Sequence, residues 1–242
     1  MRSRVVVLVC ALAAMPSAHA ADDWAFSGNL GLRSTYMSRG IGQTDGKSSR
    51  FFGADVAWRD TVYVGMWSSN VDFSASGDTH TRREYDVYAG WRPKVGIVTL
   101  DVGYAYYGYS HQPRDTRVSY SEWYVRGSVP VGPVVMGLSV NYSPDYPGMV
   151  QRAYYTEGTV AWAIDDAWTL SGVVAHQQEA HAVFRPNGHI GSFGYNAWNL
   201  GATWRFTPTW SADLRYWNTD AHDAGDPFHP HLVASIKADF SR

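Results

Sequence analysis

The chain has 242 residues, of which 45% are hydrophobic and 17% charged, and its formal net charge at pH 7 is -2. This composition is too apolar for an intrinsically disordered chain, and the weak negative charge excludes the basic surface that binds nucleic acid. No run of about 18 apolar residues follows the first 20 residues, which excludes a helical membrane bundle. Aromatic residues make up 15% of the chain, and with 23 glycines and 11 prolines they favour strands and turns over helices.

The N-terminal segment has the order of features of a secretory signal peptide. Two arginines precede an apolar stretch over residues 5–15, and residues 18–20 read Ala-His-Ala, a small-residue cleavage site. We therefore predict that residues 1–20 are a signal peptide that directs export and is cleaved, and that residues 21–242 form one domain. The alternative is a short membrane anchor. The single cysteine lies in the signal peptide, so the remaining domain has no disulfide.

Short stretches of alternating apolar and polar residues recur along the rest of the chain. In the first of them, Leu30 and Leu32 alternate with Asn29 and Arg33, a pattern typical of a β-strand with one polar face. Both faces of residues 61–69 are mixed, so the orientation of that strand is open. The twelve predicted strands cover, in chain order, residues 29–36, 52–58, 61–69, 84–91, 98–106, 122–129, 134–142, 157–162, 168–175, 198–206, 210–216 and 232–240.

The links between these strands alternate long and short without exception. Residues 59–60, 130–133, 165–167 and 207–208 are among the short links. Soluble β-sandwiches follow no such rule, whereas outer-membrane barrels have short periplasmic turns, longer external loops and an even number of strands. The sequence therefore predicts an all-β fold, a single 12-stranded antiparallel transmembrane β-barrel with short periplasmic turns and long external loops.

Aromatic side chains lie on the apolar face beside the short links. Such a girdle marks the membrane–water interface of outer-membrane barrels, which makes outer-membrane lipid the expected partner of this face. Ordinary core aromatics of a soluble protein are the alternative. The predicted interface aromatics are Trp58, Trp91, Trp162, Trp168, Trp204, Trp210 and Phe240.

Three segments carry a family resemblance. Residues 36–45 read Tyr-Met-Ser-Arg-Gly-Ile-Gly-Gln-Thr-Asp, residues 65–73 read Gly-Met-Trp-Ser-Ser-Asn-Val-Asp-Phe, and residues 84–91 read Glu-Tyr-Asp-Val-Tyr-Ala-Gly-Trp. Together they resemble the TorF-type family of proteobacterial outer-membrane porins over the first third of the mature chain. The family usually has serine at the place of Gly42, and its chains usually end on the aromatic residue, whereas two residues follow Phe240 here.

The resemblance implies a porin-type channel of undefined solute in the Gram-negative outer membrane, with no reaction attached. It also implies assembly by the barrel assembly machinery, for which the aromatic Phe240 in the closing strand is important. We expect small hydrophilic solutes or ions to cross by passive diffusion. No cofactor is expected.

The polar strand faces predict which side chains line the pore. Arg39 starts the first long loop, and Gly40 and Gly42 permit positive φ, so this loop either folds into the lumen with Arg39 at a constriction or forms a tight external turn. Acidic side chains outnumber basic ones on the polar faces, which predicts a modest cation preference. The pore-lining candidates are Arg33, Arg39, Asp55, Asp86, Asp101, Arg126, Glu157, Asp213 and Arg215.

Two other function classes are compatible with a barrel. One is a non-conducting structural or adhesin-like barrel. The other is an outer-membrane lipid-modifying enzyme of the phospholipase kind, with His176 on the apolar side, but no serine follows two residues on and no catalytic residue is assigned. The histidines in or beside the last two external loops are expected to be polar loop residues rather than metal ligands. They are His176, His181, His189, His222, His229 and His231, with Asp220, Asp223 and Asp226 nearby.

Overall fold

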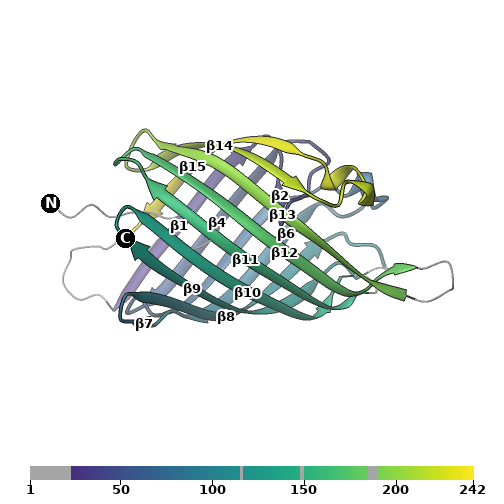
Figure 1. The fold of residues 1–242 in the computed structure, drawn as a ribbon, viewed down its shortest axis with the longest axis horizontal. Helices are drawn as coiled ribbons and strands as arrows, with labels where there is room; N and C mark the ends of the chain where they lie inside the picture. The colour runs from purple at the N-terminus through teal and green to yellow at the C-terminus, as the bar shows by residue number, and fades with distance from the viewer. Residues whose placement is uncertain (1–22, 115–116, 148–149, 185–189) are drawn as a thin grey trace.

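The computed structural model describes residues 23–242 except 115–116, 148–149 and 185–189 (Figure 1). The predicted signal peptide lies outside the described residues. Among the described residues, no helix has the length and apolarity needed to cross a membrane. The elements are β1 (Trp24–Arg33), β2 (Met37–Ser38), β3 (Ile41–Gly42), β4 (Ser49–Trp58), β5 (Val62–Asn70), η1 (Ser74–Ser76), β6 (Arg83–Trp91), β7 (Lys94–Val95), β8 (Val98–Ser110), β9 (Tyr120–Val131), β10 (Val134–Tyr146), β11 (Gln151–Ala163), β12 (Trp168–Phe184), β13 (Ile190–Arg205), β14 (Trp210–Thr219), η2 (His222–Ala224), η3 (Asp226–Phe228) and β15 (His231–Ser241).

The strands form one closed antiparallel barrel, which confirms the predicted fold class. Twelve of them pair with their neighbours in chain order, and the ring closes because β15 pairs with β1. Across the closing seam, Leu30 of β1 lies opposite Ala238 of β15, while on its other side it lies opposite Phe52 of β4. Strands β2 and β3 form a separate hairpin, and β7 is a short addition to the link between β6 and β8. Because the ring is closed, each of the twelve described strands pairs with a neighbour on both sides.

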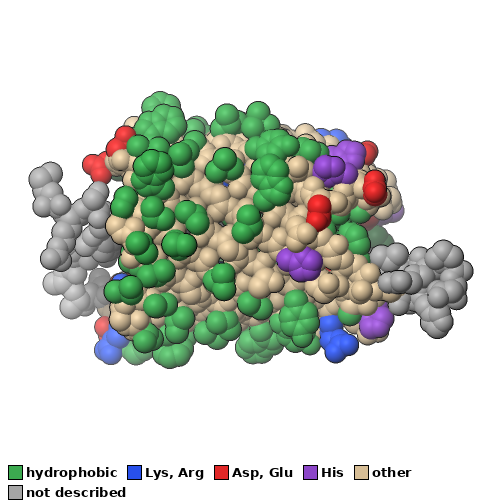
Figure 2. All heavy atoms as spheres, viewed as in Figure 1, with side chains coloured by type: hydrophobic (Ala, Val, Ile, Leu, Met, Phe, Trp, Pro, Cys, Tyr) green, Lys and Arg blue, Asp and Glu red, His purple; other side chains and the backbone are tan. Residues whose placement is uncertain are grey.

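The barrel is apolar outside and polar inside, the reverse of a soluble protein. Leu138, Val174 and Leu200 are among the outward side chains and are 67%, 68% and 61% exposed. Figure 2 shows hydrophobic side chains spread over the barrel wall, while histidine side chains gather toward the end that carries the long loops and acidic side chains lie at both ends. Strand alternation places the small and charged residues inward, so the interior is the place to look for function.

The structure resolves the strand whose orientation the sequence left open. In β5, Val62, Val64 and Met66 point outward, whereas Tyr63 is buried and Trp67 is half-buried in the interior. Aromatic rings face inward here because each lies beneath a guanidinium, Arg92 over Tyr63 and Arg33 over Trp67. These contacts come from other strands and links, so the local pattern of β5 could not show them.

Several strands run further toward the long-loop end than the alternation predicted. The strand predicted over residues 168–175 continues to Phe184, and the strand predicted over residues 198–206 begins at Ile190. Backbone pairing between β12 and β13 continues past the apolar band to Glu179 and Phe193. In β12 the residues from His176 to Glu179 are polar on both faces, so hydrophobic periodicity no longer marks the strand.

Candidate functional site

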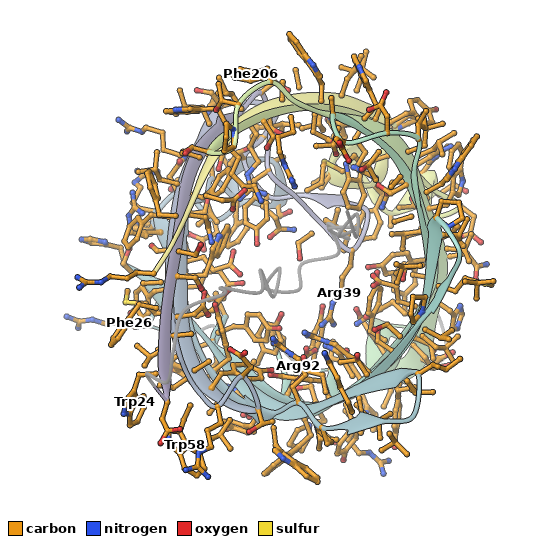
Figure 3. All side chains as sticks on the ribbon, turned by 90° about the vertical axis from the view of Figure 1, so that its left-hand side faces the viewer. Trp24, Phe26, Arg39, Trp58, Arg92 and Phe206 are labelled. Atoms are coloured by element: carbon orange, nitrogen blue, oxygen red, sulfur yellow. The ribbon has the colours of Figure 1, made fainter. Side chains whose placement is uncertain are left out.

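The first long loop, residues 34–48, enters the barrel as the β2–β3 hairpin. The two central turn residues, Arg39 and Gly40, have φ values of 52° and 83°, the positive φ pair of a two-residue hairpin turn. Gly42 has no positive φ. The Tyr195 hydroxyl of β13 donates a hydrogen bond to the Arg39 carbonyl at 3.2 Å, which joins the turn to the far wall. Seen down the barrel axis, Arg39 points into the lumen (Figure 3).

The Arg39 guanidinium is held by the wall formed by β9, β11 and β12. Its Nη2 donates to Glu122 Oε2 at 2.5 Å, its Nη1 donates to Gln177 Oε1 at 3.3 Å, and its carbon lies 4.4 Å from the Tyr155 ring centre. Glu122 is only 1% exposed and also accepts a hydrogen bond from Asn141 at 3.0 Å. The hairpin therefore spans the interior from the β1 side to the opposite wall, and its tip is a charge-assisted contact.

The outer part of the first loop is docked on the second loop, residues 71–82. Lys47 Nζ lies 2.7 Å from Asp72 Oδ2, and the Ser74 hydroxyl donates to Asp72 Oδ1 at 2.6 Å. These contacts lower the pKa of Asp72 to about 2, with the Lys47 hydrogen bond as the largest cause. The Asp72 backbone N–H also donates to the Gln43 carbonyl at 2.8 Å. Both loops are thus fixed to each other at the barrel mouth.

An aromatic cluster anchors the two loops from below. Tyr36, Val71, Tyr109 and Tyr120 are buried against one another, and the rings of Tyr107 and Tyr120 stack at 4.5 Å. Apolar burial of this kind is the main stabilising term of a core. The cluster therefore fills one side of the barrel mouth with packed aromatic side chains. The other side of the mouth is lined by polar side chains of the wall.

A second charged cluster lies near the short-link end. Asp101 of β8 accepts a hydrogen bond from the Tyr63 hydroxyl at 2.6 Å and lies 3.7 Å from Arg92 and 3.9 Å from Arg126. The Tyr63 and Tyr124 hydroxyls are 2.6 Å apart. Arg92 points inward from the link after β6 (Figure 3). Alternation assigns no face to Arg92, because this residue lies in a short link.

The other pore-lining candidates are distributed around the wall. Asp55 accepts a hydrogen bond from the Tyr88 hydroxyl at 2.7 Å, and Glu157 accepts one from Tyr155 at 3.0 Å. Arg33 stacks on aromatic rings, at 4.3 Å from that of Tyr36. Each of these three candidates thus has an aromatic partner of its own.

Arg215 and Asp213 form a third charged group, on β14. Arg215 Nη2 lies 3.0 Å from Asp213 Oδ2, and Nη1 donates to Asn199 Oδ1 at 2.7 Å. Thr203 donates to the same carboxylate at 2.8 Å. Of the nine candidates, the structure thus brings together two pairs, Arg126 with Asp101 and Arg215 with Asp213.

Three residues that hold Arg39 were not among the candidates. They are Glu122, Tyr155 and Gln177, contributed by β9, β11 and β12. Alternation marks each as inward, but it cannot show that a loop from another part of the chain reaches them. Asp86, the remaining candidate, lies on β6 beside Glu84, with both side chains in the interior.

The seven predicted interface aromatics lie on the outer surface. Trp168 and Trp204 pair across β12 and β13 with stacked rings 5.9 Å apart. Exposed aromatic rings on an outer surface fit an amphipathic interface. Exposed side chains are found at Trp58, Trp91, Trp162, Trp168, Trp204, Trp210 and Phe240.

A polar group interrupts the outer surface near the long-loop end. His176 Nδ1 lies 2.9 Å from Asn196 Oδ1, and Asn196 Nδ2 donates to Asp220 at 2.6 Å. A hydrogen bond from the Asn196 backbone N–H is the largest cause that lowers the pKa of Asp220. Thr156 lies directly opposite His176 in the β11–β12 register. No serine or threonine hydroxyl is hydrogen bonded to His176 among the described residues.

The loop histidines do not converge on one point. Among the described residues, no three histidine, cysteine, aspartate or glutamate side chains lie close enough to share a metal ion. The rings of His222 and His229 are 5.6 Å apart, and His222 Nε2 is hydrogen bonded to Asn218 at 2.8 Å. His189 lies outside the described residues.

The fold is similar to that of solved outer-membrane channels. The KdgM porin in complex with disordered oligogalacturonate has a TM-score of 0.58 and 7% identity, with 89% of this chain and 99% of that chain covered. An outer membrane channel from Pseudomonas putida F1 has a TM-score of 0.58 and 10% identity, with 94% and 99% covered. The NanC porin has a TM-score of 0.52 and 14% identity, with 88% and 97% covered. At these identities the likeness shows the fold.

The chain also matches a known protein family. None of the curated proteins compared with this sequence matches it. A family model described as "Bacterial protein of unknown function (Gcw_chp)" matches residues 17–231. This match covers most of the strands and the whole inserted hairpin, so the chain belongs to the Gcw_chp family of bacterial proteins.

Proposed function

We propose that the barrel is an outer-membrane channel through which small hydrophilic solutes or ions diffuse passively. The observation that carries this proposal is the inversion of polarity, with leucine, valine and aromatic side chains outside and a charged interior. In water that outer surface would be an unusually large exposed apolar area, whereas in a bilayer it is the required lipid contact. A polar lumen in turn suits solutes that the lipid excludes.

The outer aromatic residues indicate how much of the barrel lies in the membrane. Trp198 and Trp204 lie six residues apart on the outer face of β13. At about 3.3 Å per residue and a tilt near 40°, this separation spans roughly 15 Å along the membrane normal, within an apolar band of about 25 Å. Export by the predicted signal peptide, folding by the barrel assembly machinery and the TorF-type resemblance belong to the same proposal.

The inserted hairpin is the proposed constriction. A 12-stranded barrel is intermediate between small filled barrels and wide 16-stranded porins, and the Arg39–Glu122 contact crosses its interior. A solute therefore passes beside the hairpin rather than through an unobstructed ring. The pore-lining role of the nine candidates is part of this proposal.

The charge balance favours cations and neutral solutes. The KdgM porin is described in complex with oligogalacturonate, a polyanion. Here the inward acidic residues outnumber the basic ones, so we do not extend that ligand class to this chain. The inward basic residues are Arg33, Arg39, Arg92, Arg126, Arg205, Arg215 and Lys237, and the inward acidic residues are Asp55, Glu84, Asp86, Asp101, Glu122, Glu157, Glu179, Asp213 and Asp239.

The test is ion conduction by the purified protein in a planar bilayer. We expect discrete conductance steps and, across a tenfold KCl gradient at low ionic strength, a reversal potential of the sign for cation preference. The preference should weaken at high salt because the Debye length falls to about 3 Å at 1 M. Arg39→Ala should raise both the conductance and the cation preference, while Arg59→Ala, in an exposed link, is the matched control and should change neither.

No conductance in the bilayer, under conditions in which a known porin conducts, would contradict the proposed channel function. That result would favour the structural or adhesin-like barrel. A clear anion preference would contradict the role of the wall charges.

The lipid-modifying enzyme stays as a second candidate because of one observation. The His176–Asn196–Asp220 chain orients an imidazole on the outer surface, as a base in a hydrolytic site is oriented, and Thr156 lies opposite His176 in the strand register. Release of fatty acid from mixed phospholipid micelles, lost in both Thr156→Val and His176→Ala, would support it. No release by the wild-type protein would exclude this activity on those lipids.

A further inference from the structure

Two carboxylates lie side by side on the inner face of β6. Glu84 and Asp86 are two residues apart, so both point into the barrel. Glu84 lies opposite Ser69 of β5, and Asp86 lies opposite Trp67 of the same strand. Both acids are buried, with exposures of 3% for Glu84 and 9% for Asp86.

One oxygen of each carboxylate lacks a hydrogen-bond donor. Glu84 Oε2 and Asp86 Oδ1 are shielded from solvent and accept no hydrogen bond from any described residue. Other interior carboxylates are satisfied, as Glu122 is by Arg39 and Asp101 is by Tyr63. A buried carboxylate oxygen without a donor is costly unless a positive charge meets it. The two oxygens without donors, on neighbouring inward side chains of β6, thus indicate a ligand that supplies a positive charge.

The nearby charges leave one negative charge uncompensated. The carboxylates that repel Asp86 are those of Glu84 and Glu122. Glu84 accepts hydrogen bonds from the Tyr36 and Tyr109 hydroxyls, and the basic groups that act on it are Arg33 and Arg39. Arg39 is bound to Glu122, and Arg33 is stacked on aromatic rings. With all three carboxylates ionised, three negative charges face two guanidinium groups, and a monovalent cation neutralises the remaining charge of -1.

We propose that Glu84 and Asp86 together bind one monovalent metal cation, of the size of potassium, inside the barrel. Glu84 Oε2 and Asp86 Oδ1 are the protein ligands, since hard cations take oxygen ligands, and water completes the shell. A divalent ion is disfavoured because it would leave an excess positive charge and because no third acidic or histidine ligand converges there among the described residues. Binding does not require conduction, but any contribution of the site to cation preference rests on the proposed channel.

Rubidium replaces potassium and is visible by anomalous diffraction, so it is the direct probe. Crystals of the full-length mature protein grown in rubidium chloride at neutral pH should show an anomalous peak between Glu84 and Asp86. The double variant Glu84→Gln/Asp86→Asn keeps the side-chain shapes and should lose that peak. The control Asp239→Asn removes an interior carboxylate that Lys237 already pairs at 3.0 Å, and it should keep the peak. No peak in the wild-type protein, as expected if the two acids share a proton, or a peak that persists in the double variant, overturns the proposal.

Thermal unfolding in detergent tests the same site without crystals. A ligand that binds only the folded state raises the Tm, so potassium chloride should raise it above N-methylglucamine chloride at equal ionic strength. The double variant should lose this difference and, without potassium, should unfold no earlier than the wild-type protein, because two buried carboxylates with unsatisfied oxygens are gone. An equal potassium effect in both proteins overturns the proposal. A rubidium peak in a protein that does not conduct would contradict the channel alone, and conduction without the peak would contradict the site alone.

Discussion

Arg39 and Glu122 show how one buried contact closes off part of a wide interior. Glu122 is almost fully shielded, and Arg39 is its charged partner, with Asn141 as a further donor. Removing one member of such a pair leaves an uncompensated charge, whereas removing both can be nearly neutral. The pair is therefore expected to be strongly coupled in both stability and conduction.

Arg39→Ala should lower the free energy of unfolding by about 3–5 kcal/mol, because Glu122 then stays buried without its cation. The double variant Arg39→Ala/Glu122→Gln should recover most of that loss. Urea unfolding of the four proteins of this cycle in detergent micelles measures both effects. A loss that is equal in the single and double variants would show that the contact itself is not responsible.

Asp72 gives a prediction about pH at the barrel mouth. Its pKa is lowered to about 2 by Lys47 and Ser74, from an unfolded value near 3.9. A lowered carboxyl pKa stabilises the folded state above the unfolded value, and the stabilisation is lost as the pH falls through the folded value. Loop docking should therefore persist at pH 4 and weaken toward about pH 2.

The carboxyl carbon shift of Asp72, followed by NMR as a function of pH, measures this pKa directly. We expect a midpoint near 2 in the wild-type protein and a midpoint closer to the ordinary value in Lys47→Met. A wild-type midpoint near 4 would contradict the Lys47–Asp72 contact.

The β2–β3 hairpin is the element on which the proposed constriction depends. Gly40 has a φ of 83°, and a Cβ atom there would lie 2.7 Å from Thr219 Cγ2 and 2.8 Å from the Ala197 Cβ. Gly46, in the same loop, has a φ of 70°, but no atom lies within 4 Å of a Cβ placed there. The two positions share the backbone requirement and differ only in how close the wall is.

Gly40→Ala should displace the hairpin from the wall, whereas Gly46→Ala should not. Alanine in the left-handed conformation should lower the free energy of unfolding of both variants by about 1–2 kcal/mol. Only Gly40→Ala should also raise the single-channel conductance. Unfolding in urea and conductance in planar bilayers separate the two effects. Equal conductance in the two variants would mean that the hairpin tip does not limit the passage.

The whole barrel makes a prediction about depth in the membrane. Leu200 is 61% exposed on the outer face of β13, between the aromatic residues Trp198 and Trp204, and Leu232 is 64% exposed at the long-loop end of β15. Arginine at the bilayer midplane costs about 2–4 kcal/mol, and near an interface it costs about 0–1 kcal/mol. The two leucines are equally exposed and differ in depth.

Leu200→Arg should therefore destabilise the protein in lipid vesicles by about 2–4 kcal/mol, and Leu232→Arg by about 1 kcal/mol or less. Reversible unfolding in vesicles measures the two free energies. Equal costs for both substitutions would contradict the proposed insertion and favour an outer face covered by something other than a bilayer.

The sequence by itself determined the existence of the twelve strands and the antiparallel barrel. Alternation with a period of two is a local property, since successive side chains of a strand point to opposite faces. The face of residues such as Asp55, Asp101 and Arg215 follows from that alternation. The alternating link lengths, also local, distinguished a barrel with two unlike ends from a sandwich.

Only the tertiary structure decided what occupies the interior. Arg39 lies more than 80 residues before Glu122 in the chain, and the contact between them exists because the hairpin folds across the closed ring. The inward orientation of the Tyr63 ring in β5 and of Arg92 depends in the same way on partners contributed by other parts of the chain. Periodicity assigns a side chain to a face, but it carries no information about which distant residues share the enclosed space. The inserted hairpin, and the Glu84–Asp86 pair in which one oxygen of each carboxylate has no donor, therefore became visible only after the barrel was closed.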